Sequence, residues 1–259
     1  RKHRKDEVMG LLQDYQVILS DLMQKILLEE SENLGAAAEL LAQCYAEDRL
    51  IHVFGAGGHS AVAAMEIFWR AGGLTKINAM FPSGTNILSA QPTTAKITGL
   101  APYILNYYDV NPGDPLILVN FYGLNPIAVD VALEAQKRGV KLITVNSHSF
   151  AKQVPMNFKW RHPSKKNIHE LAEVAIDNHV PYPDAVLKVD KLEQEITPSA
   201  TILTCFVLNC LMTETISRLV QMGVQPEVWI SNNIPGCDEH NNPLVDKYKH
   251  RIHHLYPVV

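Results

Sequence analysis

The sequence predicts an α/β protein in which helices flank a parallel β-sheet. Three short apolar runs, at residues 50–54, 115–119 and 142–145, each end abruptly in small or polar residues. Helix-compatible sequence follows each run, at once for the first two and after a longer connection for the third. Buried parallel strands have continuous apolar sequences, and their alternation with helices implies right-handed crossovers.

Composition narrows the class of protein. The 259 residues suffice for one large α/β domain, and 47% apolar residues provide a core. A net charge of −4 gives no electrostatic case for nucleic-acid binding. The sequence contains no run of 18 apolar residues, so we expect no transmembrane helix. The basic residues 1–5 are not followed by the apolar stretch of a secretory signal, so we expect no such signal here.

The four cysteines show no CxxC spacing, and they do not form the closely spaced pattern of a small, secreted, disulfide-bonded protein. We therefore expect reduced, mostly buried thiols in a cytoplasmic protein.

The first 48 residues predict a helical extension. Apolar residues recur with helical spacing over 7–28 and again over 34–45, with a possible cap at 31–33. We expect residues 1–48 to pack on the rest of the chain or on a second subunit, and residues 49–259 to form the main domain.

Within the main domain, strands and helices are expected to alternate. The expected strands lie at 50–54, 77–81, 115–119, 142–145 and 174–176. The expected helices lie at 60–71 (stopped by Gly72 and Gly73), 94–108, 126–138, 166–172, 199–222 and 241–256.

The loop at residues 55–60 is the strongest local signal. Its glycines allow backbone amides to approach a ligand, and the following helix directs its positive end to the same place. A dinucleotide-binding turn requires glycine where Ser60 stands and an acidic residue about twenty positions later, and residues 76–81 offer none. A P-loop lysine is also missing. The alternative is a tight turn that needs glycine only for its backbone.

Two residues near this loop are candidates for proton transfer. Glu66 lies in the following helix, where its carboxylate could move a proton between adjacent sugar carbons. However, Arg70 is four residues later, and the residues alone favour an ordinary surface ion pair. His59 is on the loop itself, although a loop histidine can equally serve only to orient the backbone.

Other polar clusters have weaker interpretations. Ser147 and Ser149 follow the strand at 142–145 and suit either a phosphate or a tight turn. The basic residues 161–166 could close over an anion or form a solvated turn. Neither residues 238–240 nor the histidines near the C-terminus have metal-site spacing, so no metal is expected.

Several segments together resemble the sugar isomerase (SIS) domain family, in particular a bacterial subgroup of single-domain members. The resemblance covers almost everything from residue 50 onward. It is carried by residues 58–60, 66–74, 161–164, 176–178, 197–201, 231–232 and 236–241.

The resemblance implies a flavodoxin-like, five-stranded parallel sheet in three layers that binds phosphorylated sugars. Family members are commonly dimers or tetramers, so a homodimer or homotetramer is expected, with no cofactor, nucleic acid or membrane partner. One loop departs from the family pattern, because residues 120–125 lack the usual serine-rich phosphate grip. The phosphate would then rest on other groups, or the ligand is a modified or less charged sugar. The substrate-binding residues expected are Gly57, Gly58, Ser60, Asn120, Asn125, Ser147, Ser149, Thr197, Ser199 and Thr201.

The function expected from this resemblance is aldose–ketose isomerisation of a phosphorylated sugar or amino sugar through an enediol(ate). Glu66 would be the base, and His59 an acid or ring-opening group. The alternatives are a non-catalytic phosphosugar sensor and, third, a lyase that cleaves a sugar-acid ether. Fold alone does not decide among them.

Overall fold

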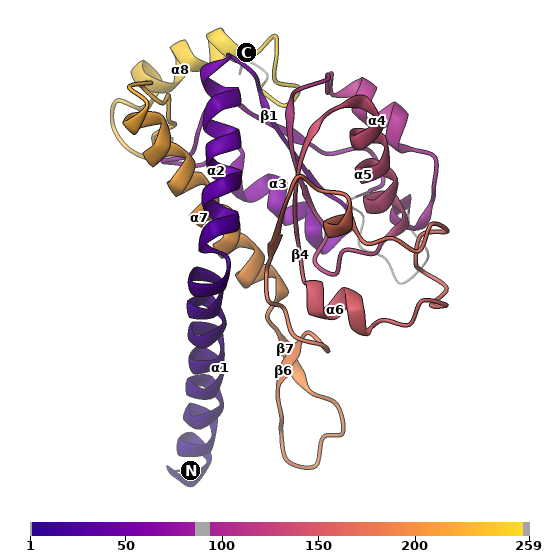
Figure 1. The fold of residues 1–259 in the computed structure, drawn as a ribbon. Helices are drawn as coiled ribbons and strands as arrows, with labels where there is room; N and C mark the ends of the chain where they lie inside the picture. Colours follow the sequence, from indigo (N-terminus) through magenta and orange to yellow (C-terminus); the bar gives the residue numbers. More distant parts are fainter. Residues whose placement is uncertain (1, 86–93, 256–259) are drawn as a thin grey trace.

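The computed structural model describes residues 2–85 and 94–255, and within them it contains a five-stranded parallel sheet (Figure 1). The strands are β1 (Ile51–Gly55), β2 (Ile77–Met80), β3 (Pro115–Val119), β4 (Lys141–Asn146) and β5 (Val174–Asp177). Their order is β2-β1-β3-β4-β5, and every neighbouring pair is parallel. The predicted flavodoxin-like fold class is therefore confirmed.

Helices and one hairpin complete the described chain. The α-helices are α1 (Lys2–Glu29), α2 (Ser31–Ala46), α3 (Val62–Ile67), α4 (Ala101–Tyr107), α5 (Pro126–Arg138), α6 (His148–Gln153), α7 (Ala200–Gln221) and α8 (Cys237–Tyr248). Short 3₁₀ turns are η1 (His59–Ala61), η2 (Thr94–Lys96) and η3 (Ile168–Glu170), and strands β6 (Ala185–Leu187) and β7 (Ile196–Pro198) pair antiparallel.

The core has two layers because successive strand residues point to opposite faces of the sheet. Val53 and Ile117 pack toward α2, α3 and α7, whereas Leu116 and Leu118 pack toward α4 and α5. All four side chains are fully buried. The predicted N-terminal helical pair is present, and α2 belongs to the first of these layers (Figure 1). The domain boundary at residue 48 stays a prediction.

Helix α7 forms the centre of the first layer. By length and composition it could cross a membrane, but the core helix of a soluble protein meets the same criterion. Of its most apolar window, 44% is buried in the fold, where α7 packs on α2 and α3.

The helix expected at 60–71 is shorter than predicted. It begins as η1, continues as α3 and ends at Ile67, because Phe68 is extended (φ −91°, ψ 132°). Gly72 and Gly73 do not stop a helix. Instead, the N–H of Gly72 donates to the carbonyl of Trp229 at 2.7 Å, and the N–H of Trp229 donates to the carbonyl of Gly73 at 3.0 Å.

Other element boundaries also differ. The helix expected at 94–108 is divided into η2 and α4 by a stretch that contains Gly99 (φ 90°), and only η3 forms within 166–172. Helix α8 begins four residues before the predicted helix at 241–256, whose last residue lies outside the described part of the chain. Neither α6 nor the β6–β7 hairpin was predicted.

All four cysteines are free thiols, as predicted, but the expectation that most are buried is wrong. Cys44 is buried, whereas Cys205, Cys210 and Cys237 are half-buried. The difference arises because Cys205 and Cys210 lie outside the fully buried face of α7.

Candidate functional site

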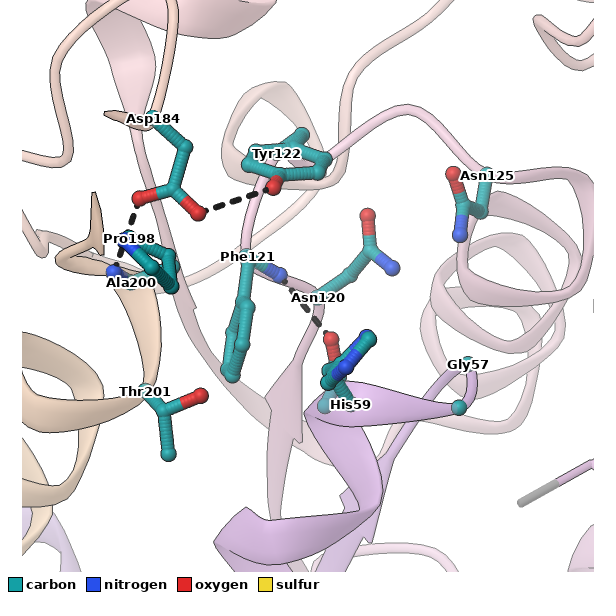
Figure 2. Close-up of a pocket in the computed structure, with 12 residues that line it drawn as sticks. Gly57, His59, Asn120, Phe121, Tyr122, Asn125, Asp184, Pro198, Ala200 and Thr201 are labelled. Carbon is teal, nitrogen blue, oxygen red and sulfur yellow. Dashed lines mark hydrogen bonds between the residues drawn. The ribbon is translucent and has the colours of Figure 1, made fainter. Parts of the chain in front are cut away.

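A cavity of about 280 Å³ lies beyond the carboxyl ends of β1 and β3, at the lower end of the size range of small-molecule sites. In the strand order, β1 and β3 are where the chain changes direction, which is where open α/β sheets place their ligands. Figure 2 shows its lining residues, which come from loops far apart in the sequence. They are Gly57, Gly58, His59, Ser60, Asn120, Phe121, Tyr122, Asn125, Asp184, Pro198, Ala200 and Thr201.

The loop after β1 forms one wall because its glycines permit a very tight turn. A Cβ on Gly55 would lie 1.9 Å from the carbonyl oxygen of Ser60, so only glycine fits there. Gly57 has φ 117°, a conformation that L side chains rarely adopt. Within residues 2–85 and 94–255, the N–H groups of Gly57 and Gly58 donate to no backbone carbonyl.

Asn120 stands where relatives were expected to carry hydroxyl residues, and it holds two loops together. Its Nδ2 donates to the carbonyl of Ala56 at 2.6 Å, and its Oδ1 accepts the N–H groups of Gly123 at 2.8 Å and Leu124 at 3.3 Å. Ser60 adds a second link, because its Oγ accepts the N–H of Phe121 at 3.1 Å. These side chains shape the cavity wall.

Asn125 precedes α5 and presents a side-chain amide that makes no capping hydrogen bond. Its Nδ2 lies 3.2 Å from the position that a Cβ on Gly57 would occupy, so it faces the glycine loop (Figure 2). The Asn125 amide, the glycine loop and the positive end of α5 therefore lie together at one end of the cavity.

Asp184 lies at the opposite end, and nothing in the sequence signalled it. Its Oδ1 accepts the N–H groups of Ser199 and Ala200, both at 2.9 Å, and the hydroxyl of Ser199 at 3.1 Å. The hydroxyl of Tyr122 donates to its Oδ2 at 3.3 Å (Figure 2). The N-terminus of α7 is thus capped by the chain's own carboxylate.

The Tyr122 hydroxyl stays protonated at neutral pH. Burial, followed by the negative charge of Asp184, raises its pKa to about 12. Tyr122 therefore serves as a hydrogen-bond donor in this cavity and not as a base.

Seven of the residues predicted for the site line the cavity. They are Gly57, Gly58, His59, Ser60, Asn120, Asn125 and Thr201. Glu66, Ser147, Ser149, Thr197 and Ser199 are not among its lining residues.

The two serines after β4 have other neighbours. The fully buried Ser147 hydroxyl donates to the carbonyl of Val180 at 2.6 Å and accepts the N–H of Phe150 at 3.1 Å, so it caps α6. Ser149 is exposed, with its Oγ 3.3 Å from that of Ser147. Ser147 therefore forms the tight turn that the sequence analysis gave as the alternative to phosphate binding.

The residues at the start of α7 are also engaged. Ser199 is fully buried and donates its hydroxyl to Asp184. Thr197 is half-buried in β7 with φ 67°. Of the three hydroxyl residues predicted here to bind an anion, which are Thr197, Ser199 and Thr201, only Thr201 lines the cavity.

Glu66 lies in α3 and contacts α7. Its carboxylate accepts a hydrogen bond from Asn209 at 3.0 Å and lies 3.7 Å from Arg70. This is the ion pair that the four-residue spacing favoured, and the role of Glu66 as a base stays a prediction.

Two residues of the basic cluster at 161–166 make structural contacts. Arg161 is buried and donates to the carbonyls of Ala151 and Val154 and to Asn167. His162 contacts Asp130 at 3.0 Å. Among the described residues, no group of three or more His, Cys, Asp or Glu side chains could hold a metal ion.

The protein is thus an α/β protein with a cavity at the carboxyl ends of its strands. The chain belongs to the SIS domain family, whose sequence profile matches residues 14–147. The resemblance stated from the sequence is therefore confirmed.

Individual proteins extend this similarity over nearly the whole chain. A UPF0309 protein of Caldanaerobacter subterraneus is 35% identical over 239 residues, which cover 90% of this chain and 95% of that protein. A UPF0309 protein of Shouchella clausii is 30% identical over 95% of this chain and 100% of its own length. Among solved structures, phosphoheptose isomerase from Neisseria gonorrhoeae has a similar fold, with 17% identity, a TM-score of 0.50 and coverage of 82% of this chain and 98% of that chain.

Proposed function

We propose that the cavity binds a phosphorylated sugar or amino sugar and that the protein catalyses its aldose–ketose isomerisation. The observation that carries the binding proposal is the convergence of free donors at one end of the cavity. Gly57 and Gly58, whose N–H groups donate to no backbone carbonyl of the described residues, line the cavity there together with Asn125 at the N-terminus of α5. Such a group of donors suits an anion such as a phosphate.

Membership of the SIS domain family supports a sugar phosphate as the ligand. One solved protein of similar fold is a phosphoheptose isomerase, which agrees with this choice of ligand and reaction. The cavity volume of about 280 Å³ is also in keeping with a monosaccharide derivative.

Isomerisation requires a group that removes a proton from one sugar carbon and returns it to the next through an enediolate. Of the two residues predicted to move protons, His59 lines the cavity. We assign this transfer to the His59 imidazole. The Tyr122 hydroxyl, which keeps its proton and donates it to Asp184, would accept a hydrogen bond from a sugar hydroxyl.

Binding without turnover is the second candidate. It is favoured by the position of Glu66, which is paired with Asn209 and Arg70 and is not part of the cavity lining. A homodimeric or homotetrameric assembly and a cytoplasmic location likewise stay predictions.

A thermal-shift screen followed by proton exchange separates these candidates. Fructose 6-phosphate, glucosamine 6-phosphate and sedoheptulose 7-phosphate would be compared with the same sugars lacking phosphate. Isomerisation predicts a rise in melting temperature with a phosphorylated sugar and deuterium incorporation at its C1–C2 positions in heavy water. Binding without exchange supports the second candidate, and no binding of any phosphorylated sugar contradicts both.

Variants then test the residue roles. His59→Ala should abolish exchange, and His250→Ala, at an exposed histidine, should leave it unchanged. Glu66→Gln tests the predicted base, because wild-type exchange in this variant rules that role out.

A further inference from the structure

We propose that Asp184 determines which way a sugar phosphate lies in the cavity and excludes ligands with a second anionic group. This inference rests on the proposed function and deepens it. The phosphate would lie at the end formed by Gly57 and Asn125, and sugar hydroxyls or an ammonium group would face Asp184.

The first step is that the N-terminus of α7 already has an anion. Helix α7 is 22 residues long, so its first turn is a favourable place for negative charge. Oδ1 of Asp184 accepts both the Ser199 and the Ala200 N–H groups at 2.9 Å. A ligand phosphate therefore cannot use these two donors unless it displaces the carboxylate.

The second step is the charge of the cavity wall. Among the described lining residues, Asp184 is the only carboxylate, and neither lysine nor arginine is present. The charge of Asp184 is therefore not offset by a lysine or an arginine in this lining. A phosphate or carboxylate placed beside it would meet like charge in a partly desolvated site, which is costly.

The third step is that the Asp184 end still accepts hydrogen bonds. Oδ1 of Asp184 already accepts three hydrogen bonds, whereas Oδ2 receives only the Tyr122 hydroxyl at 3.3 Å, which leaves acceptor capacity on Oδ2. Sugar hydroxyls and protonated amines are the complementary donors. The expected ligand class is therefore a sugar with one phosphate and a neutral or amine-bearing far end, not a bisphosphate or a phosphorylated sugar acid.

Calorimetric titrations with fructose 6-phosphate and fructose 1,6-bisphosphate test this inference. The variants are Asp184→Asn, which removes charge at nearly constant shape, and Asp184→Glu, which keeps it. Asp190→Asn, at an exposed position outside the cavity lining, is the matched control. Near-UV circular dichroism would confirm that each variant folds.

We expect the wild type, Asp184→Glu and Asp190→Asn to prefer the monophosphate by about tenfold or more, since like charge is repelled. Asp184→Asn should bring the two affinities close together. Equal affinities in the wild type, or an unchanged preference in Asp184→Asn, overturn the inference.

A separate readout covers the case in which no sugar phosphate binds, so that the proposed function fails. Asp184→Ser frees the two α7 N–H groups, and inorganic phosphate should then raise its melting temperature more than that of the wild type. The absence of this difference overturns the inference independently of the sugar.

Discussion

Asp184 accepts the backbone N–H of Ala200 at 2.9 Å, although the two residues are 16 positions apart. The β6–β7 hairpin lies between them and returns the chain to the same place (Figure 1). A residue before the hairpin therefore caps the helix that follows it, and this cap forms one end of the proposed sugar site.

Loss of this cap should destabilise the fold measurably. Replacing Asp184 by Ala removes the carboxylate that satisfies two N–H groups of α7, and we expect a loss of about 1–2 kcal/mol in the free energy of unfolding. Urea denaturation measures it. Asp190→Ala, at an exposed residue, should change the unfolding free energy by less than about 0.5 kcal/mol. Equal effects of the two substitutions would argue against the capping role.

Gly55→Ala should damage the β1 loop. The added Cβ would lie 1.9 Å from the Ser60 carbonyl oxygen and 2.6 Å from the Cα of Ala61, so the backbone must shift. We expect destabilisation of about 1–3 kcal/mol, as for other overpacked sites. In contrast, Gly10→Ala meets open space inside α1 and should stabilise by up to about 1 kcal/mol. A Gly55→Ala protein with wild-type thermal stability would contradict this description of the turn.

The two cavity asparagines should behave differently. Asn120→Ala removes hydrogen bonds to Ala56, Gly123 and Leu124 in a buried position. Each bond contributes roughly 1 kcal/mol, and the groups left behind lose their partner, so we expect the free energy of unfolding to fall by about 2–4 kcal/mol. Asn125→Ala should change stability by less than about 0.5 kcal/mol, because its side chain makes no capping bond. Denaturant titrations of both variants make the comparison. Similar losses in both would show that Asn125 is structural.

Stability at acid pH should depend on Glu30. Burial by itself raises the pKa of Glu30. The nearby His179 ring and the hydrogen bonds from Asn33 and the Asp177 N–H lower the pKa by more than burial raises it. The pKa of Glu30 therefore lies below its ordinary value of 4.5. Because the folded-state pKa is depressed, this stabilisation is present above pH 4.5 and is lost as the pH falls through the folded-state pKa.

The measurement is the unfolding free energy of the wild type and Glu30→Gln between about pH 6 and pH 3, a window chosen to span the ordinary carboxyl pKa. The wild type should lose more stability than the variant on acidification. Parallel curves for the two proteins would show that Glu30 does not contribute.

The sheet could be predicted because its strands carry their signal locally. Residues 115–119 form a continuous apolar run ended by a polar loop, and all five are buried in β3. The glycines that follow the first strand were equally visible in the sequence, and Gly57 and Gly58 do lie in the cavity wall.

The errors came from contacts between distant parts of the chain. Helical spacing continues past Ile67, but the backbone of Gly72 and Gly73 pairs with Trp229 instead of extending α3. Ser147 lies in a polar loop whose composition suits a phosphate site, yet its hydroxyl donates to the carbonyl of Val180, in the loop after β5. The carboxylate of Asp184 reaches Ser199 only because of the hairpin. These contacts join residues that are far apart in the sequence, so local sequence patterns do not predict them.

The most direct test is a calorimetric titration of the wild type and Asn125→Ala with fructose 6-phosphate and with fructose. Phosphate recognition at the Gly57 and Asn125 end should make the phosphorylated sugar bind at least about tenfold more tightly to the wild type, and Asn125→Ala should lose most of that difference, since a hydrogen bond to a charged group contributes about 1.5–3 kcal/mol. Equal affinities of the wild type for the two sugars, or the full preference retained without the Asn125 amide, would contradict a phosphate site at this end of the cavity.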